Sequence, residues 1–257
     1  MIEQAPRITP IAADDRFAFD CRPGVACFNA CCRDLSQVLT PYDVLRLTRG
    51  LGLQTGEFLR RYTACRIGPG SGLPVVSLVP GDPVERTCPF LLPSGCRVYR
   101  DRPSSCRTYP LMRAVRRDRA TGRLSEEFML LREPHCGGFE TGPVRTPAEW
   151  TAEQGLAPYH AENDRLLEVI SVKNRFCPGP LPPQAAGEAA ACLYDLDRLR
   201  DGLGGSNARR LGPEAELVAA ARTDDLALLH LGMERVKRLI AEPFSGPATT
   251  QGEAPWS

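Results

Sequence analysis

The sequence predicts an α+β fold, in which a loop-rich, cysteine-rich part with short strands and helices precedes a mainly α-helical C-terminal part. Two observations lead to this prediction. Nine of the eleven cysteines fall in residues 1–139, among segments rich in Pro, Gly and Arg. The later residues instead repeat apolar side chains at helical spacing. At 257 residues, the chain has room for one large domain or two small ones.

The first elements can be placed from local signals. Alternating apolar and polar residues over 16–20 predict a short strand. Thr40 suits a helix N-cap, Pro41 the first helical position and Asp43 the positive end of the helix dipole. We therefore expect a helix from this point, which Gly52 can close.

The middle of the chain is less regular. A second short helix is expected over 56–62, a Gly- and Pro-rich loop over 68–74 and a buried strand over 74–79. Residues 88–110 show little periodicity, whereas residues 127–132 have the pattern of a strand.

The C-terminal half is expected to be helical. Thr146 and Glu149 have the spacing of a capping box, which predicts a helix to about residue 154. Further helices are expected over 158–176, 189–200 and 213–241, with a linker over 178–183 and a frayed tail in the last fifteen residues.

These elements suggest a division of the chain into four parts: a leader (1–16), a cysteine-cluster domain (17–140), a helical extension packed on it (141–176) and a helical C-terminal region with a flexible tail (177–257). The charge follows this division. Residues 1–139 carry 20 Arg and 14 acidic residues, and residues 140–257 carry 12 basic and 17 acidic residues. A basic first half and an acidic second half thus underlie a net charge of +1.

Neither membrane insertion nor secretion is expected. The longest uncharged stretch, residues 67–81, has Gly or Pro at seven of its fifteen positions. The first residues include Glu3, Asp14 and Asp15 and lack the pattern of a secretory signal. We therefore expect a cytoplasmic protein, and in that reducing compartment spaced cysteines indicate metal binding or catalysis rather than disulfides.

The cysteine spacing predicts a metal site. Eight thiols would match two four-thiolate centres, which suit either zinc or an iron–sulfur cluster. The consecutive side chains of Cys31 and Cys32 tend to diverge, so they fit two irons of one cluster or two separate sites better than a single ion. The candidate ligands are Cys21, Cys27, Cys31, Cys32, Cys88, Cys96, Cys106 and Cys136.

Residues 97–123 contain nine arginines and two acidic residues. Arg97, Arg102 and Arg107 could offset the charge of a thiolate centre, about −2 overall, or bind an anionic substrate. A solvated surface is the second interpretation. Nucleic-acid binding through Arg113, Arg116, Arg117 and Arg119 is the third, and it is not favoured because the whole chain has a pI near 7.5.

Several other residues have two interpretations each. His135 could ligate the metal, transfer a proton or be structural. Tyr99 and Tyr109 could line a pocket or pack over the centre. Cys65, Cys177 and Cys192 are expected to be small buried apolar residues, and His160 and His230 are assigned no role.

Two sequence blocks resemble the YkgJ-like cysteine-cluster family, also described as the CxxCxxCC zinc- or iron-chelating domain. The first is Cys27-Phe-Asn-Ala-Cys31-Cys32, in which Cys27 and Cys31 are separated by three residues rather than two. The second comprises Cys88-Pro-Phe-Leu-Leu and the segment from Gly95 to Pro110, GCRVYRDRPSSCRTYP. The resemblance covers residues 17–140 and includes the LTPYDVLRL segment at 39–47.

The resemblance implies metal or iron–sulfur binding. A branch of the family includes flagellin lysine methylases, so it also implies an S-adenosylmethionine-dependent protein lysine methylase as an alternative. The glycine clusters at 68–72 and 202–205 are expected to be ordinary turns rather than nucleotide loops.

Together these observations predict a metal-binding protein. An iron–sulfur centre, 4Fe–4S in preference to other types, with a redox or protein-modifying role is the leading hypothesis, and a structural zinc module is the alternative. Whether the chain is an enzyme is left open. The expected partners are a protein substrate or an electron-transfer protein, and nucleic acid is not expected.

Overall fold

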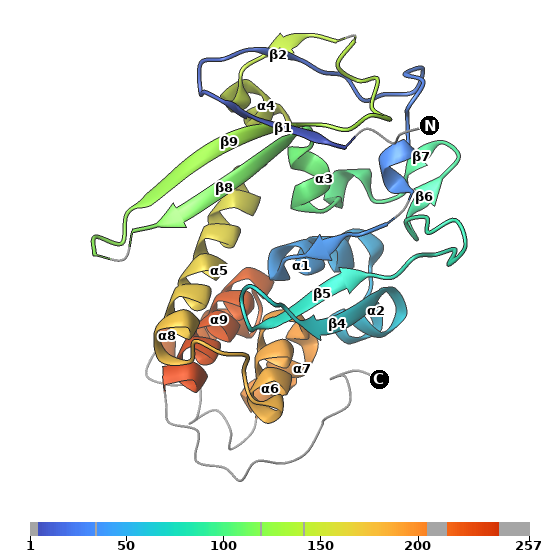
Figure 1. Cartoon of the computed structure of the whole chain (residues 1–257). Coiled ribbons are helices and arrows are strands. Elements are labelled where there is room, and N and C mark those ends of the chain that lie inside the picture. Colours follow the sequence, from blue (N-terminus) through green and yellow to red (C-terminus); the bar gives the residue numbers. More distant parts are fainter. Residues whose placement is uncertain (1–4, 34, 119, 141, 205–214, 242–257) are drawn as a thin grey trace. The chain divides into compact units, whose positions relative to one another are not determined.

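The computed structural model describes residues 5–33, 35–118, 120–140, 142–204 and 215–241 (Figure 1). Helices and several small antiparallel sheets confirm the predicted α+β class. The chain folds into two compact units. Unit 1 contains residues 1–37 and 80–164, and unit 2 contains residues 38–79 and 165–257.

The largest sheet of unit 1 has three antiparallel strands. Strand β9 (Leu124–Arg132) lies between β1 (Arg7–Ile11) and β8 (Leu111–Arg117). The strand expected over 127–132 is confirmed and begins three residues earlier. Figure 1 shows β8 and β9 as a long hairpin.

Two strands of this sheet were not expected. Strand β1 lies inside the polar leader, and β8 lies inside the arginine-rich segment. In β8 the residues alternate: Leu111, Arg113 and Val115 are buried or half-buried, and the residues between them are exposed. Because some inward positions carry Arg, the sequence lacks the alternation of apolar and polar residues that normally indicates a strand.

The remaining elements of unit 1 are short. Four short strands form two antiparallel pairs. Strand β2 (Phe17–Ala18) pairs with β10 (Val144–Arg145), and β6 (Leu91–Leu92) pairs with β7 (Gly95–Cys96). The strand expected over 16–20 is therefore confirmed in its central residues. The short helices are η1 (Ala30–Cys32), η2 (Tyr99–Asp101) and α3 (Ser104–Thr108).

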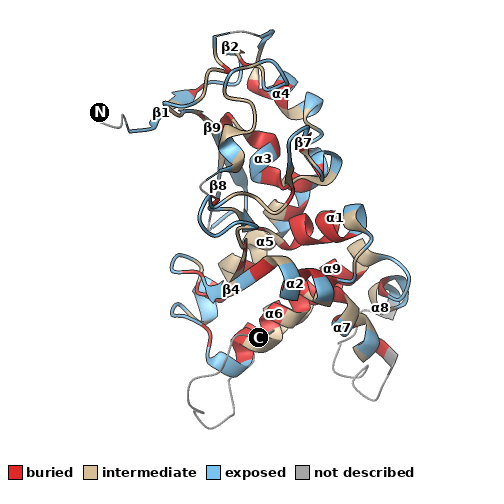
Figure 2. Cartoon of the chain, turned by 90° about the vertical axis from the view of Figure 1, so that its right-hand side faces the viewer, coloured by how far each residue is buried: buried red, intermediate tan, exposed pale blue. Residues whose placement is uncertain are grey.

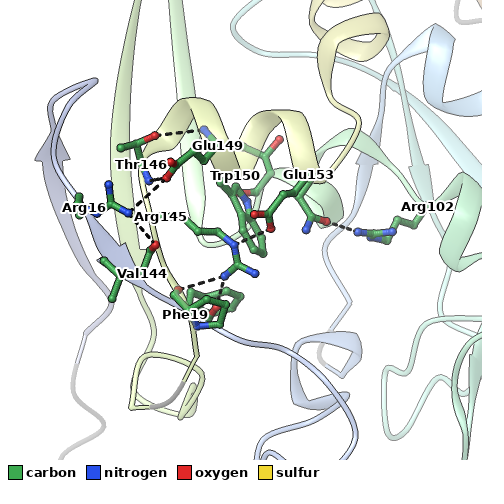
Figure 3. A network of polar contacts seen from close by, with 12 residues as sticks. Arg16, Phe19, Arg102, Val144, Arg145, Thr146, Glu149, Trp150 and Glu153 are labelled. Atoms are coloured by element: carbon green, nitrogen blue, oxygen red, sulfur yellow. Dashed lines mark hydrogen bonds and ion pairs between the residues drawn. The ribbon is translucent and has the colours of Figure 1, made fainter.

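Helix α4 (Pro147–Glu153) anchors the core of unit 1. The predicted capping box is present: Thr146 Oγ1 accepts the Glu149 amide, and the Glu149 carboxylate accepts the Thr146 amide. Trp150 packs edge-on against Phe19, with ring centroids 5.5 Å apart, and its indole donates to the Thr108 carbonyl at 3.1 Å. Arg145 reaches from β10 to the Phe19 carbonyl at 2.9 Å (Figure 3), which holds the chain just before Cys21.

The first half of unit 2 follows the predictions closely. Helix α1 (Pro41–Leu51) begins at a Thr40–Asp43 capping box and ends at Gly52, which has φ of 66°. Helix α2 (Thr55–Tyr62) follows. The sheet of this unit has the order β3 (Val38–Leu39), β5 (Pro74–Leu78) and β4 (Thr63–Ile67), so the expected strand at 74–79 is confirmed.

The predicted C-terminal helices are present, but two of them are divided. Helix α5 (Ala157–Phe176) matches the prediction; it begins in unit 1 and continues in unit 2. The single helix expected over 189–200 is wrong, because α6 (Pro183–Tyr194) stops at Asp195, whose side chain accepts the Arg198 amide and caps α7 (Leu196–Asp201).

The helix expected over 213–241 is likewise two helices, α8 (Ala215–Ala221) and α9 (Asp225–Ala241). Asp224 lies between them, where its carboxylate accepts the Ala227 amide. The short helix η3 (Gly202–Gly204) follows α7. Residues 213 and 214 and the expected frayed tail lie outside the described residues.

The apolar core of unit 2 lies along α6 and α9, where Figure 2 shows extensive buried surface. Leu228, Met233 and Val236 on α9 are almost fully buried. A Cβ atom at Gly232 would overlap the Cys192 carbonyl oxygen of α6, so these two helices are in backbone contact. Within the described residues, no helix is long and apolar enough to cross a membrane.

Candidate metal centre

The eight cysteines expected to be ligands all lie in unit 1. Cys31 and Cys32 are in η1, Cys96 is in β7 and Cys106 is in α3. Cys21, Cys27, Cys88 and Cys136 lie in loops. All eleven cysteines of the chain are described, and none of them forms a disulfide.

Backbone pairing brings the two halves of the cysteine sequence together. The Cys88 amide donates to the Cys32 carbonyl oxygen at 2.8 Å, which joins η1 to the loop before β6. The β6–β7 hairpin then places Cys96 opposite Leu91, and the Arg97 amide donates to the Phe90 carbonyl at 2.8 Å. Cys32, Cys88 and Cys96 are therefore positioned by main-chain contacts that do not require a metal.

Backbone amides point at several of the sulfur atoms. Cys88, Cys96 and Cys136 each receive the amide two residues further on, from Phe90, Val98 and Gly138 respectively. Cys27 receives the Gly137 amide, with N and Sγ 3.2 Å apart. Hydrogen bonds of this kind stabilise the thiolate, which is the form that ligates a metal.

A first thiol group consists of Cys32, Cys88, Cys96 and Cys106. Burial raises the pKa of Cys88 and of Cys96; the charges of Cys96 and Cys31 raise the pKa of Cys88 further, and the charge of Cys31 raises that of Cys96. The pKa of Cys32 is raised because its proton is shared with Cys31 and because it is buried, and the charges of Cys88 and Cys106 add to this rise. The members of this group are thus close enough to repel one another as thiolates, and a bound cation would relieve that repulsion.

A second thiol group consists of Cys21, Cys27, Cys31 and Cys136. Burial raises the pKa of Cys21 to about 11, and the charges of Cys31, Cys27 and Cys136 contribute. Cys31 also borders the first group: the hydrogen bond from Cys32 lowers its pKa. The adjacent pair Cys31–Cys32 therefore lies where the two groups meet, as expected for consecutive side chains that serve different centres or different irons.

Tyr109 lies beside the second group. Its ring packs edge-on against Phe19 with centroids 5.7 Å apart, in the same cluster as Cys136. Burial and the neighbouring Cys136 and Glu133 side chains raise the pKa of Tyr109 above its ordinary value. The hydroxyl oxygen is buried and, within the described residues, makes no hydrogen bond of good geometry.

Of the three arginines expected near the centre, Arg102 is the one close to the thiols. Its charge acts on Cys96 and Cys106, while burial lowers its own pKa. The guanidinium stacks 3.9 Å above the centroid of the Tyr99 ring and donates to the Tyr99 carbonyl at 2.6 Å. It also donates to the Gln154 side chain (Figure 3), so its position is fixed.

Arg107 and Arg97 occupy different surroundings. Arg107 is buried and donates to three backbone carbonyl groups: Arg102 at 3.1 Å, Gln154 at 2.8 Å, and Arg100. Its guanidinium also lies 4.8 Å from the centroid of the Tyr159 ring. Arg97 is exposed. In this structure the Arg107 side chain is used to join loop segments.

One of the four arginines named for nucleic-acid binding, Arg113, is paired with acidic side chains. Arg113 forms a bidentate ion pair with Asp164, at 2.7 and 2.9 Å, and a further ion pair with Glu126 at 2.8 Å. Arg116 is exposed and Arg117 is half-buried on β8. Arg119 lies outside the described residues.

The other three cysteines belong to unit 2. Cys192 is 2% exposed, and burial raises its pKa to about 11. Burial likewise raises the pKa of Cys65, in β4, to about 11. Cys177 is half-buried. The expectation that Cys192 is a small buried apolar residue agrees with its place in the α6 core.

A surface pocket of about 750 Å³ opens beside Cys31 and is lined in part by Gln37, Glu133 and His135. The exposed His135 has its Nε2 atom 3.7 Å from the Glu133 carboxylate. Gln37 was not predicted from the sequence: its amide donates to Ser105 Oγ at 2.6 Å, and its oxygen accepts from Cys106 Sγ at 3.5 Å. Neither Gln37 nor Glu133 belongs to a recognisable motif, and only the tertiary structure brings them to the thiols.

The described thiols do not converge on one point. Among the residues that the structure describes, no three side chains of His, Cys, Asp or Glu converge closely enough to hold a single metal ion as they stand. The chemistry of the donor set nonetheless fits a thiolate-ligated metal, because eight thiols lie in one unit and four of them receive backbone amides.

Comparisons with known proteins agree with this chemistry. Residues 20–137, just under half of the chain, match the model of the CxxCxxCC family, whose description is "Putative zinc- or iron-chelating domain". No curated protein and no solved structure matches the chain significantly. The matched residues include all eight expected ligands and Tyr109. Residues 20–137 are therefore similar to the CxxCxxCC family, of which YkgJ-like cysteine cluster is another name.

Proposed function

We propose that unit 1 holds a 4Fe–4S cluster through the first thiol group, Cys32, Cys88, Cys96 and Cys106. The observation that carries this proposal is the placement of these thiols. They come from three separate segments, their charges interact, and yet no three described ligand side chains converge on one point. The second group, Cys21, Cys27, Cys31 and Cys136, supplies enough thiols for a second centre.

The spacing of the thiols favours a cluster over a single ion. A zinc ion needs four sulfur atoms about 2.3 Å from one point. A 4Fe–4S cluster instead takes each cysteine on a different iron, so its ligands enclose a volume. Thiols that interact electrically and do not converge on one point are closer to the second requirement than to the first.

Amides and charge near the sulfur atoms support the same proposal. The amides of Phe90 and Val98 would stabilise thiolates at Cys88 and Cys96. Arg102 would offset part of the net negative charge of a thiolate-ligated cluster. Hydrogen bonds to sulfur and nearby positive charge are also the features by which a protein adjusts a cluster's reduction potential.

The surroundings suggest how the centre would be used. When bound, a 4Fe–4S cluster supplies one-electron chemistry. Cys31 and Cys106 are exposed, so an electron-transfer protein or a protein substrate could approach within a short distance. We infer a reducing, cytoplasmic setting, which is where a thiol-rich site of this kind stays in the ligating form.

The experiment is anaerobic purification of the full chain, followed by a visible absorption spectrum and analysis of iron, zinc and acid-labile sulfide. We expect a brown protein with equal amounts of iron and sulfide. Cys88→Ser and Cys96→Ser should lose most of the iron. Cys177→Ser, a half-buried cysteine of unit 2, is the matched control and should retain it.

A colourless protein that contains zinc, without iron or sulfide, would overturn the cluster proposal and leave a structural zinc module. The lysine methylase alternative is supported by no contact in the structure. The 68–72 glycines form the turn between β4 and β5, where the Gly72 amide donates to the Gly68 carbonyl at 2.7 Å.

A further inference from the structure

Tyr109 has an arrangement that the proposed ligand set does not explain. Its hydroxyl is buried and makes no hydrogen bond of good geometry within the part of the chain that is described, although the Cys136 and Glu133 side chains are within interaction range. A buried hydroxyl without a partner costs about 1–3 kcal/mol, so a native structure normally supplies an acceptor. The Cys136 sulfur and the Glu133 carboxylate both lie beside it.

The ring of Tyr109 is held in place. It packs edge-on against Phe19, which also contacts Trp150 and Phe139 at centroid distances of 5.5 and 5.1 Å. The same core cluster includes Cys136. The backbone on the other side is fixed as well, because the Tyr109 amide donates to the Ser105 carbonyl at 3.1 Å. The hydroxyl therefore stays next to Cys136 whether or not a metal is present.

From this geometry we infer that Tyr109 is a positioning residue, which donates its hydroxyl hydrogen to the Cys136 sulfur when that sulfur is a metal ligand. This inference rests on the proposed function extended to its second centre, because Cys136 belongs to the second thiol group and that group must also hold a metal. A metal-bound thiolate is a better hydrogen-bond acceptor than a neutral thiol. The Gly138 amide already donates to the same sulfur, so Cys136 would receive two donors.

Such a hydrogen bond should change the reduction potential of the centre. Reduction adds one negative charge to the centre, and a donor aimed at sulfur stabilises the more negative form. Tyr109 should therefore raise the reduction potential of the centre that Cys136 ligates. The alternative acceptor, Glu133, has a side chain 28% exposed to solvent and faces His135, so water and His135 can satisfy it without Tyr109.

The test is Tyr109→Phe, which removes only the hydroxyl, in the anaerobically purified full chain. Loss of a hydrogen bond that is about 1 kcal/mol stronger in the reduced centre corresponds to roughly a fivefold fall in the ratio of reduced to oxidised centre at a fixed potential. A tenfold change is a shift of about 59 mV for one electron. We expect the variant to keep its iron, to have the lower potential and to show altered iron–sulfur stretching frequencies.

Tyr159→Phe is the matched control, because Tyr159 is a buried tyrosine of the same unit that packs beneath Arg107. It should leave the potential unchanged. If Tyr109→Phe keeps the metal and the wild-type potential, the inference is wrong although the proposed function stands. If the wild type holds zinc, the wild type and Tyr109→Phe are compared after Co²⁺ has replaced the zinc. A sulfur-to-metal charge-transfer band that is the same in both proteins overturns the inference. If the wild type binds no metal, the inference and the proposed function both fail.

Discussion

The Cys88 amide donates a 2.8 Å hydrogen bond to the Cys32 carbonyl oxygen, and this contact joins two cysteine segments that are far apart in the sequence. Between them the chain leaves unit 1, builds β3, α1, α2, β4 and β5 of unit 2, and returns. The candidate ligands Cys32 and Cys88 are thus brought together by a backbone contact that does not involve a metal. The thiol loops around that contact have little regular structure, and the metal would have its main stabilising effect there.

Metal removal should therefore loosen unit 1 selectively. In hydrogen–deuterium exchange, we expect chelation to speed exchange at residues 25–37, 88–97 and 133–138, because metal–thiolate bonds would otherwise restrain these loops. Helices α6 and α9 should exchange at the same rate with and without metal. Equal acceleration along the whole chain would show instead that metal binding is required for the entire fold.

Arg107 should be more important for stability than for charge compensation. Arg107→Lys cannot reproduce three guanidinium contacts with carbonyl oxygens, and it should lower the free energy of unfolding by about 2–4 kcal/mol. Thermal unfolding with the metal content measured in parallel would test this. Arg97→Lys, at an exposed site in the same region, is the control and should change stability by less than about 0.5 kcal/mol.

Gly232 should tolerate no side chain. In Gly232→Ala the new methyl group would overlap the Cys192 carbonyl, so α6 and α9 would have to separate, at a cost of about 3 kcal/mol or more. Gly187→Ala on α6 is the matched control, since its methyl group would meet no atom within 4 Å. Denaturant unfolding should find that variant unchanged or up to about 1 kcal/mol more stable.

His160 should make unit 1 less stable in acid. Burial and the nearby Arg113 lower its pKa, and the Glu126 and Asp164 carboxylates oppose this only in part. The unfolded chain then binds a proton near pH 6.5 while the folded chain does not, so the unfolded state is favoured as pH falls through that value. The free energy of unfolding is therefore unaffected by His160 above about pH 6.5 and falls as the pH drops below that value.

His160→Gln is the variant that tests this dependence. Its unfolding midpoint should change less between pH 7.5 and 5.5 than that of the wild type, because the titrating group has been removed. An equally steep pH dependence in the variant would assign the effect to carboxylates elsewhere.

Local signals predicted much of the secondary structure. Thr40 and Asp43, and Thr146 and Glu149, mark helix starts through contacts within a single turn, so three or four residues carry the information. The helix break at Asp195 could not be predicted from such local signals. An Asp within an apolar helical pattern can lie on a solvated face or cap a new helix, and the choice depends on the Thr55 and Arg198 contacts that only the folded chain supplies.

For the candidate site, the sequence could predict which cysteines are candidate ligands but not how they are grouped in space. Spacing identified the eight cysteines, but the division into two thiol groups depends on contacts such as Gly137 N to Cys27 Sγ, across 110 residues of sequence. Gln37 and Glu133 have no local signal at all. The arginine-rich strand β8 was missed because Arg113 is paired with acidic residues of β9 and α5 rather than with solvent.

The division of unit 1 along the chain also has a consequence during synthesis. The first four cysteines leave the ribosome roughly 5–20 s before Cys136, because about one hundred residues separate them at ordinary translation rates. Until Cys88 emerges, Cys21, Cys27, Cys31 and Cys32 have none of the candidate ligands that come later in the sequence, while the nascent chain is already synthesising part of unit 2. A centre that includes Cys136 would therefore be loaded late in biogenesis, and the early thiols would be most exposed to oxidants while translation is still in progress.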